Sequence, residues 1–285
     1  RSSDLRKMEI GVEYYTYKTN TTISSLEILH EVLKMRITLE FTGEKNLILP
    51  IHYNYIVQGL LYDLMGDTDF AAFLHDVGFQ YEKRKFKLFT FSRIEGEFQI
   101  VEKPKGYKKI IIKPPFKFTV ASPLEEVIID ISKNVLKREY CHFNGQKFTL
   151  NSLNIENPPV FKEKARIKFI SPVVMYTTLR DGDKKYTYYY SPWDEKFSTL
   201  LLNNLIKKYE LVYKIRPQNP HFKLIPLVEK EDRRYSKMIK YKNVYVKGWM
   251  GIYDVETTPE LLELAYYTGL GAKNSQGFGC FEIIG

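Results

Sequence analysis

The chain ends in a glycine-rich run that restricts how its last two elements can be joined. Residues 269–279 read Gly-Leu-Gly-Ala-Lys-Asn-Ser-Gln-Gly-Phe-Gly, between an expected helix and a final apolar strand at Phe278–Ile284. Glycine reaches backbone conformations closed to other residues, and without a side chain it lets a ligand lie on backbone N–H groups. Because such a junction costs stability, the pattern favours binding of a polyanion. It matches neither a Walker loop nor the dinucleotide fingerprint.

The charge balance also favours an anionic partner. The 285 residues include 43 Lys and Arg against 34 Asp and Glu, a net charge of +9. This surplus favours nucleic acid ahead of an anionic membrane. The 22 tyrosines and 18 phenylalanines suit single-stranded RNA, whose exposed bases stack on rings. A β-rich core is the ordinary explanation for many of these rings.

The remaining bulk features indicate an intracellular protein. Cys141 and Cys280 make no metal-ligand spacing and indicate a reducing compartment. We find no apolar run that predicts a membrane span, and residues 1–34 do not read as a signal peptide. We therefore expect a cytoplasmic location. Residues 1–34 are interpreted as an N-terminal appendage, with a strand at Gly11–Tyr17 and a helix opened by Ser24.

The first half of the main body predicts strands interrupted by helices. The expected strands are Met35–Phe41, Phe86–Arg93, Phe98–Lys103, Lys108–Lys113 and Lys147–Ile155. The expected helices run from Pro50 to Met65, over Phe70–Val77, and from Pro123 to Lys137. Asn157-Pro158-Pro159 follows as the predicted linker, since two prolines break both kinds of regular structure.

The second half repeats this plan. The expected strands are Arg166–Thr178, Lys184–Tyr190, Phe222–Val228, Asn243–Val255 and Phe278–Ile284, with helices at Trp193–Tyr209 and from Pro259 to Gly269. Each half reads β-α-β-β-α-β, the ferredoxin-like arrangement. We therefore predict an α+β chain of tandem ferredoxin-like (RRM-like) domains, residues 35–157 and 158–285, with a C-terminal glycine-rich loop.

Three side chains in the first half are candidates for chemistry. His75 lies roughly opposite the apolar stripe of its helix, which Phe70, Phe73, Leu74 and Val77 form. Tyr62 lies off the apolar face of the preceding helix, and Lys87 begins a strand after the basic run 83–85. Each has an ordinary alternative: a surface histidine, a tyrosine covering a strand, and a solvated charge run.

Together these residue types suit cleavage of RNA by its own 2′-hydroxyl. A neutral imidazole can withdraw the 2′ proton near pH 7. A tyrosine hydroxyl can orient or protonate around the scissile phosphate, and a lysine can stabilise charge on pentacoordinate phosphorus. The products would be a 2′,3′-cyclic phosphate and a 5′-hydroxyl, and DNA would not be cut.

Metal chemistry is not expected from this sequence. The Asp67/Asp69 pair is predicted to cap a helix and the Asp181/Asp183 pair to flank a hairpin turn. Neither pair has a histidine or cysteine at ligand spacing. We predict no metal and no other cofactor.

Four segments then resemble one known family. The segments are Pro50-x4-Tyr55-x2-Gln58-Gly-Leu-Leu-Tyr62, Ala72-Phe-Leu-His75-Asp-Val, Lys87-Leu-Phe-Thr-Phe-Ser92 and the glycine-rich tail. Together they resemble the CRISPR-associated endoribonucleases of the RAMP superfamily, which cut repeat RNA into guide units. The resemblance covers residues 35–285. It implies a prokaryotic protein whose partner is the precursor transcript of CRISPR repeats. Association with other CRISPR-associated proteins and formation of a homodimer stay open.

The resemblance also assigns residues. It places the catalytic tyrosine, histidine and lysine on Tyr62, His75 and Lys87. The family's RNA-contacting loop falls on residues 269–279, and the positions it implies are Gly269, Gly271, Lys273, Gly277 and Gly279.

A basic run in the second half is a further candidate RNA contact. It contains Arg233, Arg234, Lys237 and Lys240 and continues to Lys247. A second basic group, at positions 103–113, is left undecided. Two alternatives to the endoribonuclease remain: a non-catalytic RNA-binding subunit of a CRISPR interference complex, and a metal-dependent nuclease.

Overall fold

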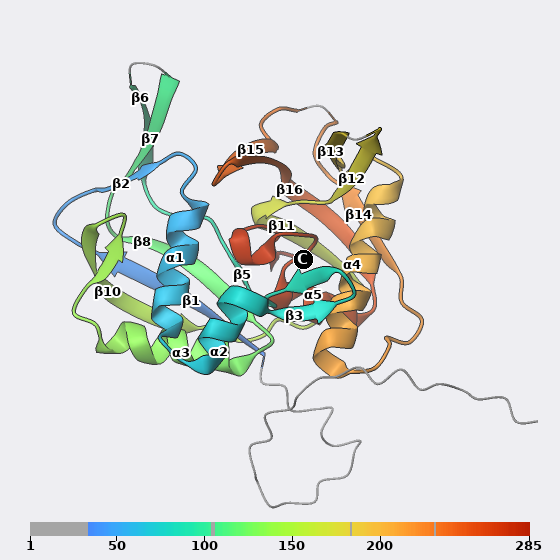
Figure 1. Ribbon diagram of the computed structural model, residues 1–285, viewed down its shortest axis with the longest axis horizontal. Coiled ribbons are helices and arrows are strands. Elements are labelled where there is room, and N and C mark those ends of the chain that lie inside the picture. The colour runs from blue at the N-terminus through green and yellow to red at the C-terminus, as the bar shows by residue number, and fades with distance from the viewer. Residues whose placement is uncertain (1–33, 104–105, 183, 231) are drawn as a thin grey trace, which may run out of the picture. The chain divides into compact units, whose positions relative to one another are not determined.

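The computed structural model describes residues 34–103, 106–182, 184–230 and 232–285 (Figure 1). The predicted strand Gly11–Tyr17 and the helix opened by Ser24 lie outside the described residues, so both stay predictions. Among the described residues, no helix is long and apolar enough to cross a membrane.

The first half of the described chain builds one large sheet with helices against it. Its elements are β1 (Met35–Thr42), β2 (Leu47–Pro50), α1 (Asn54–Met65), α2 (Asp69–Ala72), a π-helix (Phe73–Val77), β3 (Phe79–Tyr81), β4 (Arg84–Phe86), β5 (Thr90–Phe91), β6 (Phe98–Lys103), β7 (Tyr107–Ile112), β8 (Phe116–Ser122), α3 (Glu125–Lys137), β9 (Cys141–Phe143) and β10 (Gln146–Ile155). The sheet has the order β5-β8-β1-β10-β9 and is antiparallel throughout.

This sheet confirms the ferredoxin-like prediction for the first half. Its four principal strands, in the order β10-β1-β8-β5, are the fourth, first, third and second strands of a β-α-β-β-α-β unit. Ile37, Leu39 and Phe41 alternate along β1 and are fully buried. They pack in one core with residues of α1 and α3, because alternate side chains of a strand share one face. Figure 1 shows both helices crossing the same side of the sheet.

The second half repeats the topology. Its elements are β11 (Lys164–Val173), β12 (Tyr176–Asp181), β13 (Lys184–Tyr189), α4 (Lys196–Tyr213), β14 (Phe222–Pro226), β15 (Ser236–Tyr241), β16 (Val244–Thr257), α5 (Pro259–Thr268), a 3-10 turn (Asn274–Gln276) and β17 (Phe281–Ile283). The strands of its sheet, in the order β14-β16-β11-β17, are the second, third, first and fourth strands of a second β-α-β-β-α-β unit. This is the order of the first half read from the other edge, and β15 pairs with β16. The α5 helix begins as predicted, because the Thr258 side chain accepts a hydrogen bond from the Leu261 N–H and Pro259 follows the cap.

Several predicted elements were wrong in detail. The expected strand Phe86–Arg93 is interrupted at Leu88, whose φ of 55° takes the chain out of the extended conformation. Pro50 closes the edge strand β2 instead of opening a helix, and α1 begins at Asn54. The expected strand Arg166–Thr178 stops at Val173, beyond which Val174 forms a bridge with Gly271 of the glycine-rich loop.

The glycine-rich loop lies between the two halves. From the first half, Asn54 and Gln58 of α1 and Thr90 of β5 donate side-chain hydrogen bonds to carbonyl oxygens of residues 275–278, over 2.6–3.1 Å. From the second half, the Ala272 N–H donates to the Val174 carbonyl oxygen over 2.8 Å. The loop therefore joins the helix that carries Tyr62 to the second sheet. The domain boundary at residue 157 stays a proposal.

Candidate active site

The structure brings the three predicted catalytic side chains together. Tyr62 extends from α1, His75 from the π-helix, and Lys87 from the turn after β4. The Tyr62 and His75 rings pack edge to face, with centroids 4.9 Å apart and planes at 84°. The Lys87 Nζ atom donates a hydrogen bond to the His75 backbone carbonyl oxygen at 2.8 Å. Residues that are 12 to 25 positions apart in the sequence therefore lie together in the fold.

His75 is presented to solvent by an irregular turn. Its side chain is 63% exposed, and its Nδ1 atom lies 2.6 Å from the Asp76 carboxylate. A carboxylate oxygen accepts hydrogen bonds, so in the neutral ring Nδ1 carries the proton and Nε2 keeps its lone pair. The prediction that Val77 belongs to the buried stripe is wrong, since this side chain is 46% exposed. The π-helix adds a residue to the turn and shifts the positions that an α-helix would bury.

Gly78 creates the space through which Lys87 reaches His75. The backbone φ of Gly78 is 67°, and a Cβ atom built there would lie 2.7 Å from the Phe86 carbonyl oxygen. The same atom would lie 2.8 Å from the Lys87 Cδ atom. A residue with a side chain would therefore displace the lysine stem. Gly78 was not among the predicted site residues, although a glycine directly after a helix is a common signal for positive φ.

Burial shifts the proton affinities of two of the three residues. Desolvation raises the pKa of Tyr62, and the nearby Tyr241 and Asp76 add to the effect. Tyr62 therefore stays protonated at neutral pH and can donate a hydrogen bond. Desolvation and the neighbouring Lys85 lower the pKa of Lys87, whereas Asp76 opposes this change.

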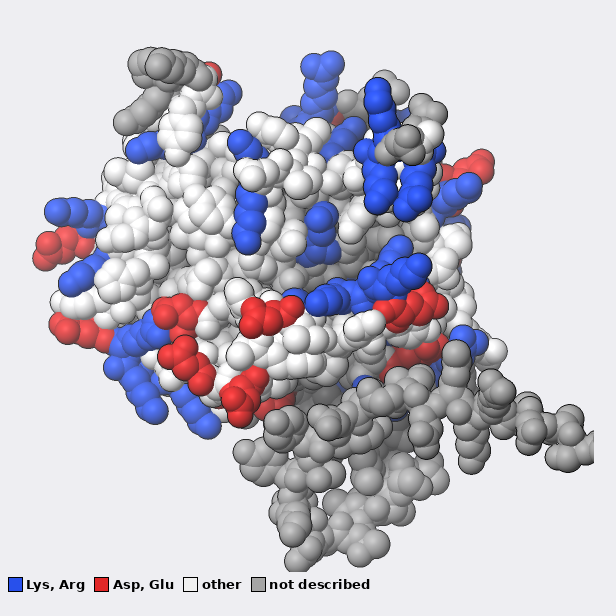
Figure 2. Space-filling model, viewed as in Figure 1, with Lys and Arg blue, Asp and Glu red and all other residues white. Residues whose placement is uncertain are grey.

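A basic groove extends from Lys87 to the glycine-rich loop. This hollow of about 620 Å³ is lined by residues 83–89, by the first residues of β12, and by Gly271 to Gln276. Its lining contains the basic side chains of Lys83, Arg84, Lys85, Lys87, Lys273 and the buried Lys208, and it contains no Asp or Glu. Figure 2 shows lysine and arginine side chains gathered along the β3–β4 hairpin. The groove can therefore hold a polyanion beside Lys87.

The glycines of the loop serve close packing within the protein. Gly269, Gly271, Gly277 and Gly279 are all buried, and of these only Gly271 is part of the described groove lining. A Cβ atom at Gly279 would lie 1.9 Å from the Leu270 carbonyl oxygen. Close packing thus explains these glycines: Gly279 packs against the loop itself, and Gly271 and Gly277 pack against Val174 and Phe91. A ligand would meet Lys273, whose Nζ lies 5.2 Å from the centre of the Tyr176 ring.

A buried lysine that sequence reasoning missed holds this loop. Lys208 of α4 is 1% exposed, and its Nζ donates to the carbonyl oxygens of Gly269 and Gly271 at 2.6 and 3.2 Å. It also donates to Asn274 Oδ1 at 2.7 Å, so all three of its N–H groups have acceptors. Desolvation lowers the pKa of Lys208 to about 7. A lysine in register with the buried Phe197, Leu201 and Leu205 was the available signal.

Acidic and metal-ligating residues form no further centre in the described part of the chain. No group of three or more His, Cys, Asp or Glu side chains there could hold a metal ion. The prediction that Asp67/Asp69 caps the helix was wrong, because Thr68 between them is the cap and accepts from the Ala71 N–H at 3.0 Å. Asp183, of the other pair, lies outside the described residues.

Comparison with known proteins finds similar chains. Residues 155–283 match a family model described as "CRISPR associated protein Cas6, C-terminal". The chain is 28% identical over 248 residues to "CRISPR-associated endoribonuclease Cas6 1" of Methanocaldococcus jannaschii, covering 86% of this chain and 91% of that protein. It is 24% identical to "CRISPR-associated endoribonuclease Cas6" of Pyrococcus furiosus, covering 83% and 84%. A solved structure named "CRISPR associated protein Cas6" superposes with a TM-score of 0.70 at 26% identity, over 88% of this chain and all of that one.

The chain is therefore similar to Cas6 proteins over most of its length. The matched C-terminal region contains the glycine-rich loop and Lys208. Tyr62, His75 and Lys87 precede that region, and their roles stay a prediction that rests on likeness and on geometry.

The predicted basic run lies apart from the groove in this Cas6 fold. Arg233, Arg234, Lys237 and Lys240 lie on or just before β15, and none of them lines the groove. Arg234 is paired with Asp232 at 2.6 Å. Burial and Arg93 of the first half lower the pKa of Lys237. The proposed RNA contact at this run would therefore be a second surface.

Proposed function

We propose that this chain is an endoribonuclease that cleaves CRISPR repeat RNA within a precursor transcript, without a metal ion. The observation that carries the proposal is the convergence of Tyr62, His75 and Lys87 from three segments, because Lys87 also lines the basic groove. The sequence likeness to proteins named as Cas6 endoribonucleases supports the substrate.

His75 is the proposed general base. Its Nε2 lone pair takes the proton from the ribose 2′-hydroxyl, and the 2′-oxygen forms a bond to phosphorus. The bond from phosphorus to the 5′-oxygen then breaks. These steps leave a 2′,3′-cyclic phosphate and a 5′-hydroxyl. They require RNA, because deoxyribose lacks the 2′-hydroxyl nucleophile.

Tyr62 and Lys87 are the proposed stabilisers of the transition state. Tyr62 is neutral because burial raises its pKa, so its hydroxyl can donate to the phosphate or to the departing 5′-oxygen, which takes up a proton as its bond breaks. The Lys87 ammonium supplies positive charge next to the His75 backbone, where negative charge develops on the phosphate oxygens.

The groove is the proposed path of the RNA strand. Lys83, Arg84 and Lys85 on one wall and Lys273 on the other would contact phosphates. These contacts confer affinity and carry little sequence information. Recognition of a particular repeat therefore requires further contacts to bases.

The proposal is tested with repeat RNA carrying one 2′-deoxy nucleotide at the cut. We expect this RNA to bind and stay intact, and the all-ribose RNA to give cyclic-phosphate ends at an unchanged rate in EDTA. Cleavage of the 2′-deoxy RNA at the normal rate would disprove the mechanism. Tight binding of all-ribose RNA without any cleavage would favour the non-catalytic subunit, and a requirement for added Mg²⁺ or Mn²⁺ would favour a metal-dependent nuclease.

A further inference from the structure

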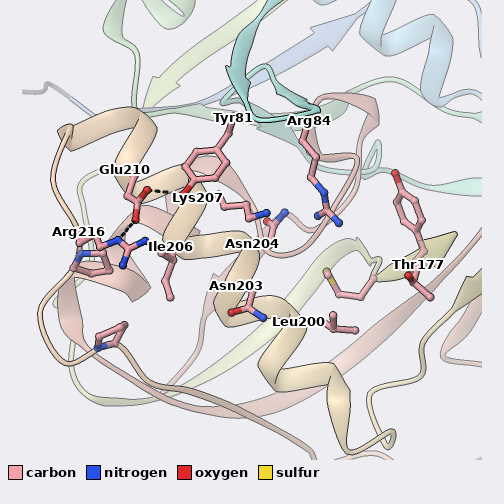
Figure 3. Close-up of a pocket in the computed structure, with 14 residues that line it drawn as sticks. Tyr81, Arg84, Thr177, Leu200, Asn203, Asn204, Ile206, Lys207, Glu210 and Arg216 are labelled. Carbon is pink, nitrogen blue, oxygen red and sulfur yellow. Dashed lines mark hydrogen bonds and ion pairs between the residues drawn. The ribbon is translucent and has the colours of Figure 1, made fainter. Parts of the chain in front are cut away.

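A second hollow opens beside the groove, between the β3–β4 hairpin and α4 (Figure 3). It has a volume of about 600 Å³, within the range of sites that hold small ligands. It shares Arg84, Met175, Tyr176, Thr177 and Asn204 with the lining of the groove. A strand lying in the groove would therefore pass its entrance.

The walls of this hollow combine apolar surface with side-chain amides. Met175, Leu200 and Ile206 contribute the apolar part, and Asn203 and Asn204 are consecutive residues of α4. Asn204 is 4% exposed, and its Oδ1 atom accepts no hydrogen bond from the described residues. An amide offers a donor and an acceptor side by side, as does the hydrogen-bonding edge of a nucleobase.

The charges around the hollow favour an anionic ligand. Glu210, the acid in its lining, accepts from the Tyr81 hydroxyl at 2.7 Å and pairs with Arg216 at 2.9 Å, so its charge is compensated. Arg84 forms no ion pair with a described residue, and Figure 3 shows its side chain pointing from the hairpin toward α4. A guanidinium in this position can contact a phosphate or stack on a base.

We propose that the hollow binds one unstacked nucleotide of the RNA, close to the scissile phosphate. The base enters between the apolar wall and the amides of α4, and Arg84 at the entrance contacts its phosphate. Unpaired RNA bases are commonly splayed out and recognised in this way. The inference rests on the proposed RNA substrate, and it supplies base contacts that the groove lacks.

The test scans the RNA with single abasic nucleotides around the cut. The RNA carries a 2′-deoxy nucleotide at the cut, and its dissociation constant is measured for the wild type and for Asn203→Trp. Asn203 is exposed, so the tryptophan can fill the hollow without disturbing the core. Thr199→Trp, one turn earlier and outside the lining, is the matched control because helical side chains lean toward the N-terminus.

We expect one abasic position to weaken wild-type binding about tenfold, the size of one stacked base. Removing the base at the same position should change the RNA affinity of Asn203→Trp by less than about twofold, because the tryptophan already excludes that base from the hollow. Thr199→Trp should behave as wild type. A flat abasic profile in the wild type, or the same profile in Asn203→Trp, would overturn the proposal. Binding of free mononucleotides blocked by Asn203→Trp, with RNA binding unchanged, would also overturn it.

This experiment is independent of the cleavage chemistry. It measures binding of an RNA that the proposed mechanism cannot cut. Failure of the mechanism would appear in the cleavage assay while the abasic profile persisted. Failure of the nucleotide site would flatten the profile while cleavage of all-ribose RNA continued.

Discussion

The ammonium group of Lys87 donates a hydrogen bond to the backbone carbonyl oxygen of His75 at 2.8 Å. The lysine therefore holds the π-helical turn and places its charge beside the His75 backbone. Because the same residue lines the basic groove, it connects the proposed base to the proposed path of the RNA.

Lys87→Ala should lower the single-turnover cleavage rate about 100-fold, the usual cost of losing one donor to a developing anion. RNA affinity should fall much less, by the loss of one phosphate contact. Lys133→Ala, which removes one exposed charge from α3, is the control for net charge. A wild-type rate in Lys87→Ala at saturating enzyme would rule out this role.

Gly78→Ala should weaken both the fold and the site. The new Cβ atom would meet the Phe86 carbonyl oxygen at 2.7 Å and the Lys87 stem at 2.8 Å, at a φ of 67°. We expect urea unfolding to show a loss of about 1–2 kcal/mol. Gly59→Ala is the comparison, since nothing lies within 4 Å of its Cβ position and alanine in a helix should stabilise by about 0.5–1 kcal/mol. Equal stability of the two variants would contradict this account.

Tyr62→Phe should distinguish the contribution of the hydroxyl to cleavage from the contribution of the ring to packing. The ring contacts to His75 and Phe89, at 4.9 and 5.8 Å, would remain. The hydroxyl makes no hydrogen bond to a described residue, so the melting temperature should change little. Cleavage should fall about tenfold to 100-fold. Because burial raises the pKa of Tyr62 above its ordinary 10.0, the wild-type rate should show no decline from tyrosine ionisation below pH 10.

Lys208→Met should release the glycine-rich loop. The substitution keeps an unbranched side chain but leaves the oxygens of Gly269, Gly271 and Asn274 without their donor. Each unpaired buried group costs about 1 kcal/mol or more, so we expect a loss of about 3 kcal/mol and weaker RNA binding. Hydrogen exchange of residues 270–278 should become faster in the variant. Unchanged exchange there would show that other contacts hold the loop.

The same lysine should make stability depend on pH. Burial lowers its folded-state pKa to about 7 from the ordinary 10.5, so between these values the unfolded chain binds more protons than the folded one. The free energy of unfolding should therefore rise with pH across this window, by up to about 1.4 kcal/mol per unit from this group. Urea titrations from pH 7 to 9.5 should show a steeper rise in wild type than in Lys208→Met. Parallel curves would mean that the three oxygens keep the ammonium charged.

Local sequence patterns predicted a helix or strand correctly where that element buries a single face. The apolar alternation of Met35–Phe41 predicted β1, and the proline at position 259 predicted the start of α5. The strand β8 was missed although Phe116, Phe118 and Val120 alternate in the same way. Leu88 has positive φ without being a turn-forming residue, so its interruption of the strand could not be read from the sequence.

The candidate site was predictable only in part. The residue types of Tyr62, His75 and Lys87 could be recognised, but the π-helical turn that exposes Val77 could not. The role of Lys208 depends on Gly269, which is 61 positions away and on another element. Contacts of this kind are set by tertiary packing and leave little trace in local periodicity.

The central claim is that His75 removes the 2′ proton, and His75→Ala measured in two assays tests it most directly. The side chain is exposed and its removal leaves no buried group unpaired, so the variant should fold normally. We predict an affinity for repeat RNA within about threefold of wild type and a single-turnover cleavage rate lower by about 1,000-fold. A variant that binds the RNA normally and cleaves it within tenfold of the wild-type rate would contradict the account.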